Sequence, residues 1–511
     1  MKHLTQSRLF RLLSIFVSGT FTTLSTQAAP NVVFILADDM GYGDVQCYNP
    51  ERGKIPTPNM DRLAAEGMKF TDAHTTSSVC TPTRYGILTG RYNWRTKLQK
   101  SVLYGFGQPL INSGRTTVAS FLKEHNYATA CVGKWHLGLG MPTTGGKLKL
   151  QGQSKTPINI DWKGRITGGP TDLGFDYFYG ISASLDMPPY IYIHNDRFVG
   201  ECTTTKAFHR KGPAHKDFEA VDVLPEIGNK ASEYIKQQQT DQPFFLYVPL
   251  NSPHTPILPS EEWKGKSSLG DYGDFQMQTD HVIGQIAKAI DDSGLAENTL
   301  LIVTSDNGCS PRAKLENLNA QGHYPSAQFR GAKADLWDGG HRVPFIVRWP
   351  AEIKAGTTSD ALVCQSDLMA TCAEILAKPL APDAGVDSVS ILPALKGESI
   401  PAKRQGLIHH SISGHFAYRQ GKWKLLLAKS SGGWSTPKEN KMPAGSPKAQ
   451  LYDMEADPGE TKNLYEEKPD IAQKLLTLLK NDVQNGRSTP GPAQKNDATI
   501  TLWKSAPRKK K

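Results

Sequence analysis

Four stretches of the chain are continuously apolar and rich in β-branched residues, and each one ends in a polar cluster. They cover residues 31–37, 128–133, 244–250 and 299–304. Uninterrupted apolar runs of this length are typical of strands that are buried on both faces of a sheet. Stretches with helical periodicity lie between them, at 60–68, 118–125 and 281–290. This alternation predicts an α/β fold built on a large, mostly parallel mixed sheet flanked by helices.

The polar clusters after the four predicted strands indicate where a site would form. They are Asp38-Asp39, Lys134–His136, Asn251–His254 and Ser305–Gly308. In parallel sheets ligands bind at the carboxyl ends of the strands. We therefore expect the four clusters to converge on one site.

The rest of the chain divides into regions that differ in residue composition and in the elements they predict. Residues 141–215 are rich in Gly, Pro and Thr, which predicts long loops over the site, and residues 362–376 predict an amphipathic helix that closes the large domain. Three short antiparallel strands are expected at 407–411, 416–419 and 423–428, with a helix at 469–484. We therefore expect a signal peptide at 1–28, a catalytic domain at 29–397, an antiparallel-sheet subdomain with a packing helix at 398–490, and a polar basic tail at 491–511.

The first residues have the organisation of a secretory signal peptide. Lys2, Arg8 and Arg11 precede an apolar stretch at 12–24, and small residues follow up to Ala28. This pattern predicts cleavage after Ala28. The apolar stretch is too short, and too interrupted by Ser and Thr, for a membrane anchor. We expect an exported protein, periplasmic or secreted, without a transmembrane segment.

The net charge of +10 is concentrated at the two ends of the chain. The predicted signal peptide carries three of these charges and residues 508–511 carry four, which leaves about +3 for the folded body. No basic stripe is interleaved with aromatic residues, so nucleic-acid binding is not expected. The terminal run is either an ordinary solvated tail or a weak attractant for acidic glycans.

Cys80 is the most informative of the seven cysteines. An odd number of cysteines in an exported protein indicates one free, reactive or modified thiol. Cys80 begins a C-x-P-x-R pattern, in which Pro82 fits the first turn of a helix that runs on to Gly90. Cys80 would then lie just ahead of a helix N-terminus, where free N–H groups favour anions. The alternative is an ordinary capped helix with a buried cysteine.

The polar clusters contain the ligands and charges of a metal-assisted site. Asp38, Asp39, Asp306 and Asn307 offer hard oxygen atoms, which suit Ca²⁺ or Mg²⁺ better than Zn²⁺. Either pair alone is equally consistent with a turn. Basic residues accompany them, and together with a divalent cation they would recognise a tetrahedral oxyanion ester. These basic residues are Arg84, Lys134, His136, His254 and Lys333.

In combination these motifs resemble the type I sulfatases, the arylsulfatase-like, formylglycine-dependent members of the alkaline-phosphatase superfamily. Thr83 stands where Ser is commonest in the family, which leaves the C-x-P-x-R core intact, and Asp338 stands where many relatives have Glu. The matching segments follow the family's order and span nearly the whole mature chain. They are Asp38-Asp39, Cys80–Arg84, Gly133–Gly138, Ser252–His254, Thr304–Gly308, Arg330–Lys333, Leu451–Asp453 and Asp457–Leu464.

The resemblance implies a role for each matching residue. A maturation enzyme would convert Cys80 to formylglycine, which hydrates to a geminal diol. Asp38, Asp39, Asp306 and Asn307, together with the modified Cys80, would hold Ca²⁺, with Mg²⁺ as the alternative. His254 would act as the general acid and His136 as the base. Lys134 and Lys333 would neutralise the sulfate, and Arg84 would hold the diol.

The expected substrate is a sulfated glycan or an aryl sulfate ester. The neighbourhoods of Asp186, Tyr190 and His323 are either sugar-contacting elements or plain scaffold. Two other functions stay open at this point. One is a phosphodiesterase or phosphonate hydrolase of the same superfamily, and the other is a non-catalytic glycan-binding homologue.

Overall fold

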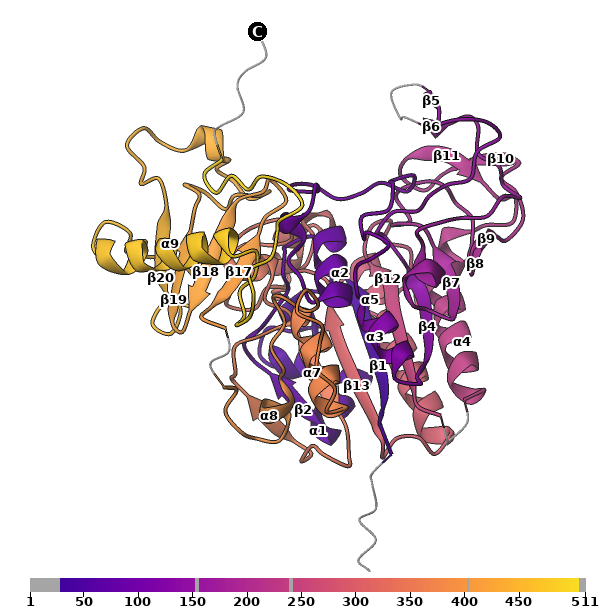
Figure 1. Ribbon diagram of the computed structural model, residues 1–511, viewed down its shortest axis with the longest axis horizontal. Coiled ribbons are helices and arrows are strands. Elements are labelled where there is room, and N and C mark those ends of the chain that lie inside the picture. The colour runs from indigo at the N-terminus through magenta and orange to yellow at the C-terminus, as the bar shows by residue number, and fades with distance from the viewer. Residues whose placement is uncertain (1–27, 152–155, 239–241, 402–403, 505–511) are drawn as a thin grey trace, which may run out of the picture.

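A computed structural model describes residues 28–151, 156–238, 242–401 and 404–504. The expected signal peptide, except its last residue, and residues 505–511 of the expected tail lie outside this part of the chain. A large α/β body carries a smaller C-terminal part, drawn in orange and yellow on the left of Figure 1. The domain boundaries expected from the sequence stay predictions.

The large body is built on one ten-stranded mixed sheet. Its centre is β1 (Asn31–Asp38), which pairs in parallel with β12 (Phe244–Pro253) and β13 (Thr299–Ser305). Every residue of these three strands is buried, as expected for strands covered on both faces. The expected mostly parallel mixed sheet is confirmed. Next to β12 the parallel series continues through β4 (Ala128–Lys134) and β7 (Tyr177–Ile181). Beyond β7 the sheet ends with β8 (Ile193–His194) and β9 (Arg197–Phe198). Beyond β13 it ends with β14 (Phe345–Arg348), β2 (Met68–Phe70) and β15 (Thr357–Ser359).

Helices cover both faces of this sheet, because alternate residues of each central strand point to opposite sides. On β1, Phe34 and Leu36 join the core under one set of helices, and Val33 and Ile35 join the core under the other. No helix among the described residues is long and apolar enough to cross a membrane. The first set is α2 (Cys80–Thr89), α3 (Val118–Glu124) and α7 (Leu368–Ile375), and the second is α1 (Pro58–Glu66), α4 (Val223–Lys236) and α5 (Asp271–Asp292).

The helix expected over residues 362–376 begins only at Leu368. Residues 363–364 form β16 (Val363–Cys364), which pairs with β3 (Ala73–His74). The Asp367 side chain accepts a hydrogen bond from the Cys364 amide at 2.9 Å, and this contact turns the chain into the helix. A tertiary strand pairing and a local cap therefore replace the first helical turns.

The region expected to form loops contains several short strands. One of them, β7, belongs to the parallel part of the main sheet, where it pairs with β4. Its five residues include a glycine, so the run gave no distinct strand signal. The other elements of the large body are short: β5 (Leu150–Gln151), β6 (Thr156–Pro157), β10 (Thr204–Ala207), β11 (Lys211–Ala214), α6 (Leu315–Ala320) and α8 (Leu392–Leu395).

The C-terminal part is a four-stranded antiparallel sheet with a helix packed on it. The expected strands are present, and a fourth was not foreseen. Leu475 and Leu479 of the helix pack with Ile408 and Leu425 of the sheet and with Trp94 of the large body. The elements are β17 (Leu407–His410), β18 (Phe416–Gln420), β19 (Trp423–Leu426), β20 (Gln450–Asp453) and α9 (Pro469–Gln484).

A buried polar cluster also joins the two parts. Lys424 on β19 donates hydrogen bonds to Asp338 at 2.7 Å and to Glu460 at 2.8 Å. The His409 ring on β17 stacks on His341, with ring centroids 3.8 Å apart. Next to His409, the carbonyl of His410 accepts hydrogen bonds from the segment that leads into α2. Polar contacts of this kind fix the orientation of the C-terminal sheet more narrowly than apolar packing alone.

Acid should weaken the structure through these interface histidines. Burial lowers the pKa of His409, and it lowers the pKa of His410 to about 3. A histidine in the unfolded chain titrates near ~6.5, so between pH 6.5 and 3 the unfolded state binds more protons and stability falls as pH falls. We expect His410 to cost about 1–2 kcal/mol between pH 7 and pH 5.

Urea unfolding followed at several pH values measures this loss. His410→Phe should flatten the dependence on pH, and His209→Phe, at an exposed position, should leave it unchanged. Equal slopes in the wild-type and His410→Phe proteins would contradict the assignment.

Candidate active site

The polar clusters after β1, β4, β12 and β13 meet at the start of α2. Asp38 and Asp39 come from the end of β1, Cys80 is the first residue of α2, and His254 follows β12. One ligand atom from each of these four residues lies within 4.8 Å of the other three. The structure therefore brings the ends of separate strands to one point, as the sequence predicted.

The carboxylates of this site are paired with buried cations. The Asp38 carboxylate accepts a hydrogen bond from Lys134 at 2.5 Å, and Asp39 accepts one from Lys333. The Arg84 guanidinium donates to Asp306 through two nitrogens, at 2.8 and 3.1 Å. None of these six residues is more than 4% exposed. Charges this deeply buried are tolerated only when each has a partner.

The carboxyl groups respond differently to this shared environment. Burial by itself would raise the pKa of Asp38, yet the nearby Lys134, His254 and Arg84 hold it well below its ordinary value. Burial and the neighbouring Asp38 charge raise the pKa of Asp306 to about 7. The repulsion between these two buried carboxylates is one that a bound cation would relieve.

Cys80 lies at the N-terminus of α2, next to a lysine. Its Sγ is 3.5 Å from Lys333 Nζ. Burial raises the pKa of the Cys80 thiol to about 12, although Lys134 and Lys333 act against this rise. The helix begins at Cys80 itself, rather than just after it, and ends at Thr89 before Gly90, whose φ of +59° is the left-handed conformation that glycine adopts freely. The unmodified thiol is protonated at neutral pH.

The two histidines keep one ring nitrogen each for chemistry. His254 Nδ1 contacts the carbonyl oxygen of Thr255, and its Nε2 lies 3.7 Å from Asp39. His136 Nε2 lies 2.8 Å from the carbonyl oxygen of Leu103, and its Nδ1 has no hydrogen-bond partner among the described residues. A carbonyl oxygen can only accept, so the nitrogen that contacts it carries the proton. Nε2 of His254 and Nδ1 of His136 are thus free to take up a proton.

Oxygen atoms without partners mark a place for a cation. Among the described residues, Asp38 Oδ1 and Asn307 Oδ1 are buried and make no hydrogen bond. The Asn307 amide is oriented by its Nδ2, which donates to Asp39 at 2.7 Å, and its Oδ1 then faces no hydrogen-bond donor. Buried polar atoms are normally satisfied, and carboxylate and amide oxygens are the ligands that hard divalent cations prefer. This buried acidic cluster has the donor set of a metal site.

Thr81 and Arg84 hold other parts of the site in position through hydrogen bonds. Thr81 was not singled out from the sequence, although it lies inside the C-x-P-x-R run. Its hydroxyl donates to the His136 carbonyl at 2.9 Å and accepts from the Leu103 amide at 3.2 Å, so it joins the Cys80 segment to the His136 segment. The donors of Arg84 go to Asp306 and to the Lys134 carbonyl, which makes it a residue that orients a carboxylate.

The residues expected at the sugar-binding loops separate into two groups. Asp186 forms an ion pair with Arg210, and the Tyr190 hydroxyl donates to the Arg210 carbonyl, so these three lie together. His323 is fully buried, and its ring nitrogens contact Asp44 at 2.8 Å and the Lys54 amide at 3.0 Å. His323 therefore belongs to the scaffold.

The chain matches two family models. The model described as Sulfatase matches residues 30–377, and the model described as N-sulphoglucosamine sulphohydrolase, C-terminal, matches residues 332–488. The N-acetylgalactosamine-6-O-sulfatase of Bacteroides thetaiotaomicron is 34% identical, over 88% of this chain and 92% of its own. Human arylsulfatase A is 31% identical, over 92% of this chain and 91% of its own.

Solved structures agree with these matches. One, described under the metabolism of multiple glycosaminoglycans by Bacteroides thetaiotaomicron, is 32% identical with a TM-score of 0.76, and the match covers 89% of this chain and 99% of that one. Another, a complex with neocarrahexaose, has a TM-score of 0.68 over 91% of this chain and 95% of that one. At 22% identity the second match shows the fold alone.

A divalent cation should stabilise the folded protein through the unpartnered oxygens. We expect Ca²⁺ to raise the melting temperature of chelator-treated protein. The free energy of unfolding should rise by about 2.7 kcal/mol when the ion is at 100 times its dissociation constant. Asn307→Ala removes one of the free oxygens and should weaken calcium binding measured by calorimetry. Asn317→Ala, on the surface helix α6, is the matched control. Unchanged calcium affinity in Asn307→Ala would contradict the site.

Proposed function

Since the chain belongs to the sulfatase family, and is a sulfatase enzyme of the type I class, we propose that it hydrolyses sulfate esters of glycans through a formylglycine made from Cys80. The observation that supports this most is the position of Cys80. It begins a helix and lies beside both Lys333 and the acidic cluster. A side chain placed there meets a helix N-terminus, a lysine and a cation site, all of which favour a sulfate group.

The proposed modification replaces the buried thiol with a group that carries two hydroxyls. A formylglycine hydrates to a diol, in which one hydroxyl can attack sulfur and the second allows sulfate to leave as the carbonyl forms again. A separate maturation enzyme would carry out the conversion of Cys80. The segment around Cys80 is held by Thr81 and by the backbone of Ser78, so the modified side chain stays in place.

Four residues would hold the metal ion, which we propose to be Ca²⁺, with Mg²⁺ as the alternative. They are Asp38, Asp39, Asp306 and Asn307, with the oxygen of the modified Cys80 as a further ligand. A bound divalent cation lowers the pKa of a neighbouring hydroxyl and attracts a sulfate oxygen. Arg84 keeps Asp306 in position for this role.

The lysines would neutralise the charge of the sulfate, and the histidines would transfer protons. Lys134 and Lys333 carry the positive charge that neutralises the sulfate oxygens. His254, whose Nε2 is on the side of the acidic cluster, gives a proton to the leaving alcohol. His136, whose Nδ1 is unprotonated and without a partner, takes the proton of the second hydroxyl. The contact with the Leu103 carbonyl supports the base role of His136, because it leaves Nδ1 unprotonated. His254 has to take up a proton at Nε2 before it can act as the acid.

A sulfated glycan is the substrate class that the relatives support best. The two described above are named for N-acetylgalactosamine-6-O-sulfate and for aryl sulfate chemistry. Such a substrate is met outside the cytoplasm, which agrees with the export signal predicted at residues 1–28. We therefore propose a periplasmic or secreted enzyme.

Rates on paired aryl esters test this function. We expect hydrolysis of 4-nitrophenyl sulfate to exceed that of bis-4-nitrophenyl phosphate. Cys80→Ala should lower the rate by at least about a thousandfold, because it removes the nucleophile. Cys372→Ala, at another buried cysteine on α7, should keep its activity.

The reverse preference would identify a phosphodiesterase or phosphonate hydrolase instead. If matured wild-type protein releases no sulfate from aryl or glycan esters but binds the glycan, the chain is a non-catalytic binding homologue.

A further inference from the structure

A groove lies where the segment after α2 meets the C-terminal part of the chain. Its volume is about 990 Å³, at the upper end of the roughly 300–1,000 Å³ that is usual for ligand sites. Its walls come from residues 97–101, 412–415, 432–440 and 501–504. Segments from three distant parts of the chain thus form one hollow.

Hydrogen bonds connect this groove to the active site. The Ile412 amide donates to the carbonyl of Ala334, the residue after the site lysine, at 3.3 Å. On the other wall the Ser101 amide donates to the Ile412 carbonyl at 2.7 Å. Two residues further on, Leu103 is bonded to Thr81, the neighbour of the nucleophile. Two segments that wall the groove are therefore bonded to the direct neighbours of Lys333 and Cys80.

The charge of the groove is strongly positive. Lys97, Lys100, Lys438 and Lys504 line it, and the one carboxylate among its described lining residues is Glu439. That carboxylate is already occupied, because it accepts hydrogen bonds from the Lys429 amide and from the amide and hydroxyl of Ser430, at 2.8–2.9 Å. Lys100 and Lys504 line the same groove, and burial together with the charge of Lys100 lowers the pKa of Lys504. An anion between them would relieve this repulsion.

Aromatic side chains complete the lining. Trp434 is 41% exposed, which is rare among the large hydrophobic residues of the described chain. Trp503 lies on the segment 501–504 of the same groove. An exposed indole offers a flat apolar surface with a polar N–H edge, and this suits a ligand with an apolar face and hydroxyl groups. A sugar ring has both.

We propose that this groove binds the part of a sulfated oligosaccharide that continues beyond the sulfate ester in the active site. The lysines would pair with further sulfate or carboxylate groups, and Trp434 would stack on a sugar ring. This inference rests on the proposed function, and it adds that the enzyme acts better on a chain than on a single sugar.

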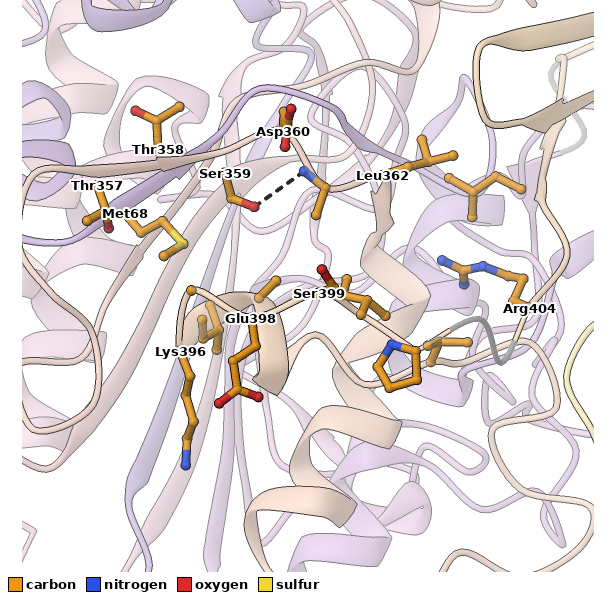
Figure 2. A pocket seen from close by; sticks show the side chains of 18 of the residues that line it. Met68, Thr357, Thr358, Ser359, Asp360, Leu362, Lys396, Glu398, Ser399 and Arg404 are labelled. Atoms are coloured by element: carbon orange, nitrogen blue, oxygen red, sulfur yellow. Dashed lines mark hydrogen bonds between the residues drawn. The ribbon is translucent and has the colours of Figure 1, made fainter.

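A second hollow differs from this groove in its charge and in its lining, and it provides a control. It has a volume of about 800 Å³ and lies against β15, the outermost strand of the main sheet. Figure 2 shows its lining, where Lys396 and Arg404 stand among Asp360 and Glu398. Its charges are mixed, and it has no aromatic lining residue among the described ones. An anionic glycan gains little there, so Lys396→Ala is a matched control for the groove lysines.

Equilibrium binding to protein that carries Cys80→Ala tests the proposal without turnover. The probes are N-acetylgalactosamine 6-sulfate and a chondroitin 6-sulfate tetrasaccharide, titrated by calorimetry at low and at physiological salt. We expect the tetrasaccharide to bind about tenfold more tightly than the monosaccharide, since each factor of ten needs only one or two good contacts. Added salt should reduce this gain.

Variants locate the gain in the groove. Trp434→Ala and the double variant Lys100→Ala/Lys504→Ala should remove it while monosaccharide affinity stays the same, and Lys396→Ala should keep it. The proposal is overturned if the tetrasaccharide binds no more tightly than the monosaccharide, or if the groove variants weaken both probes equally. A length-dependent gain in a protein that releases no sulfate when matured would support the groove and reject the proposed function.

Discussion

The site depends on a set of buried ion pairs that separate strands bring together. Asp38, Asp39 and Asp306 meet Lys134, Lys333 and Arg84 with almost no access to water. Burying charges costs more free energy than most pairs return, so apolar residues in their place would often give a more stable protein. The arrangement makes sense as preparation for a ligand that is itself charged, because its dipoles and charges are already oriented when the ligand arrives.

The C-terminal sheet contributes to this preparation from the other side. The carbonyl of His410 accepts hydrogen bonds from the Ser77 hydroxyl at 2.7 Å and from the Ser78 amide at 3.0 Å, just before Cys80. Lys424 joins the same region through Asp338, on the segment that follows Lys333. The smaller part of the chain therefore holds the Cys80 segment in place, so the geometry of the site depends on how this part packs on the large body.

The sequence predicted much of this arrangement, because burial and motif chemistry leave clear patterns. Apolar runs located β1, β4, β12 and β13, and the polar residues after them located the site. Which cation meets which carboxylate was not predictable, since Arg84 contacts Asp306 across 222 positions. The positive φ angles of Asp39 and His136, +67° and +57°, could not be located from the sequence either, although Asp and His adopt such angles more often than most residues do. Tertiary contacts impose both.

The proposed function depends above all on the conversion of Cys80 to an aldehyde in a site that suits a sulfate ester. Mass spectrometry of the tryptic peptide from Phe70 to Arg84, taken from protein made in its own host, tests it most directly. We expect a peptide in which residue 80 has lost its sulfur and reacts with carbonyl reagents. An intact thiol at residue 80 in every molecule of an active preparation would contradict it.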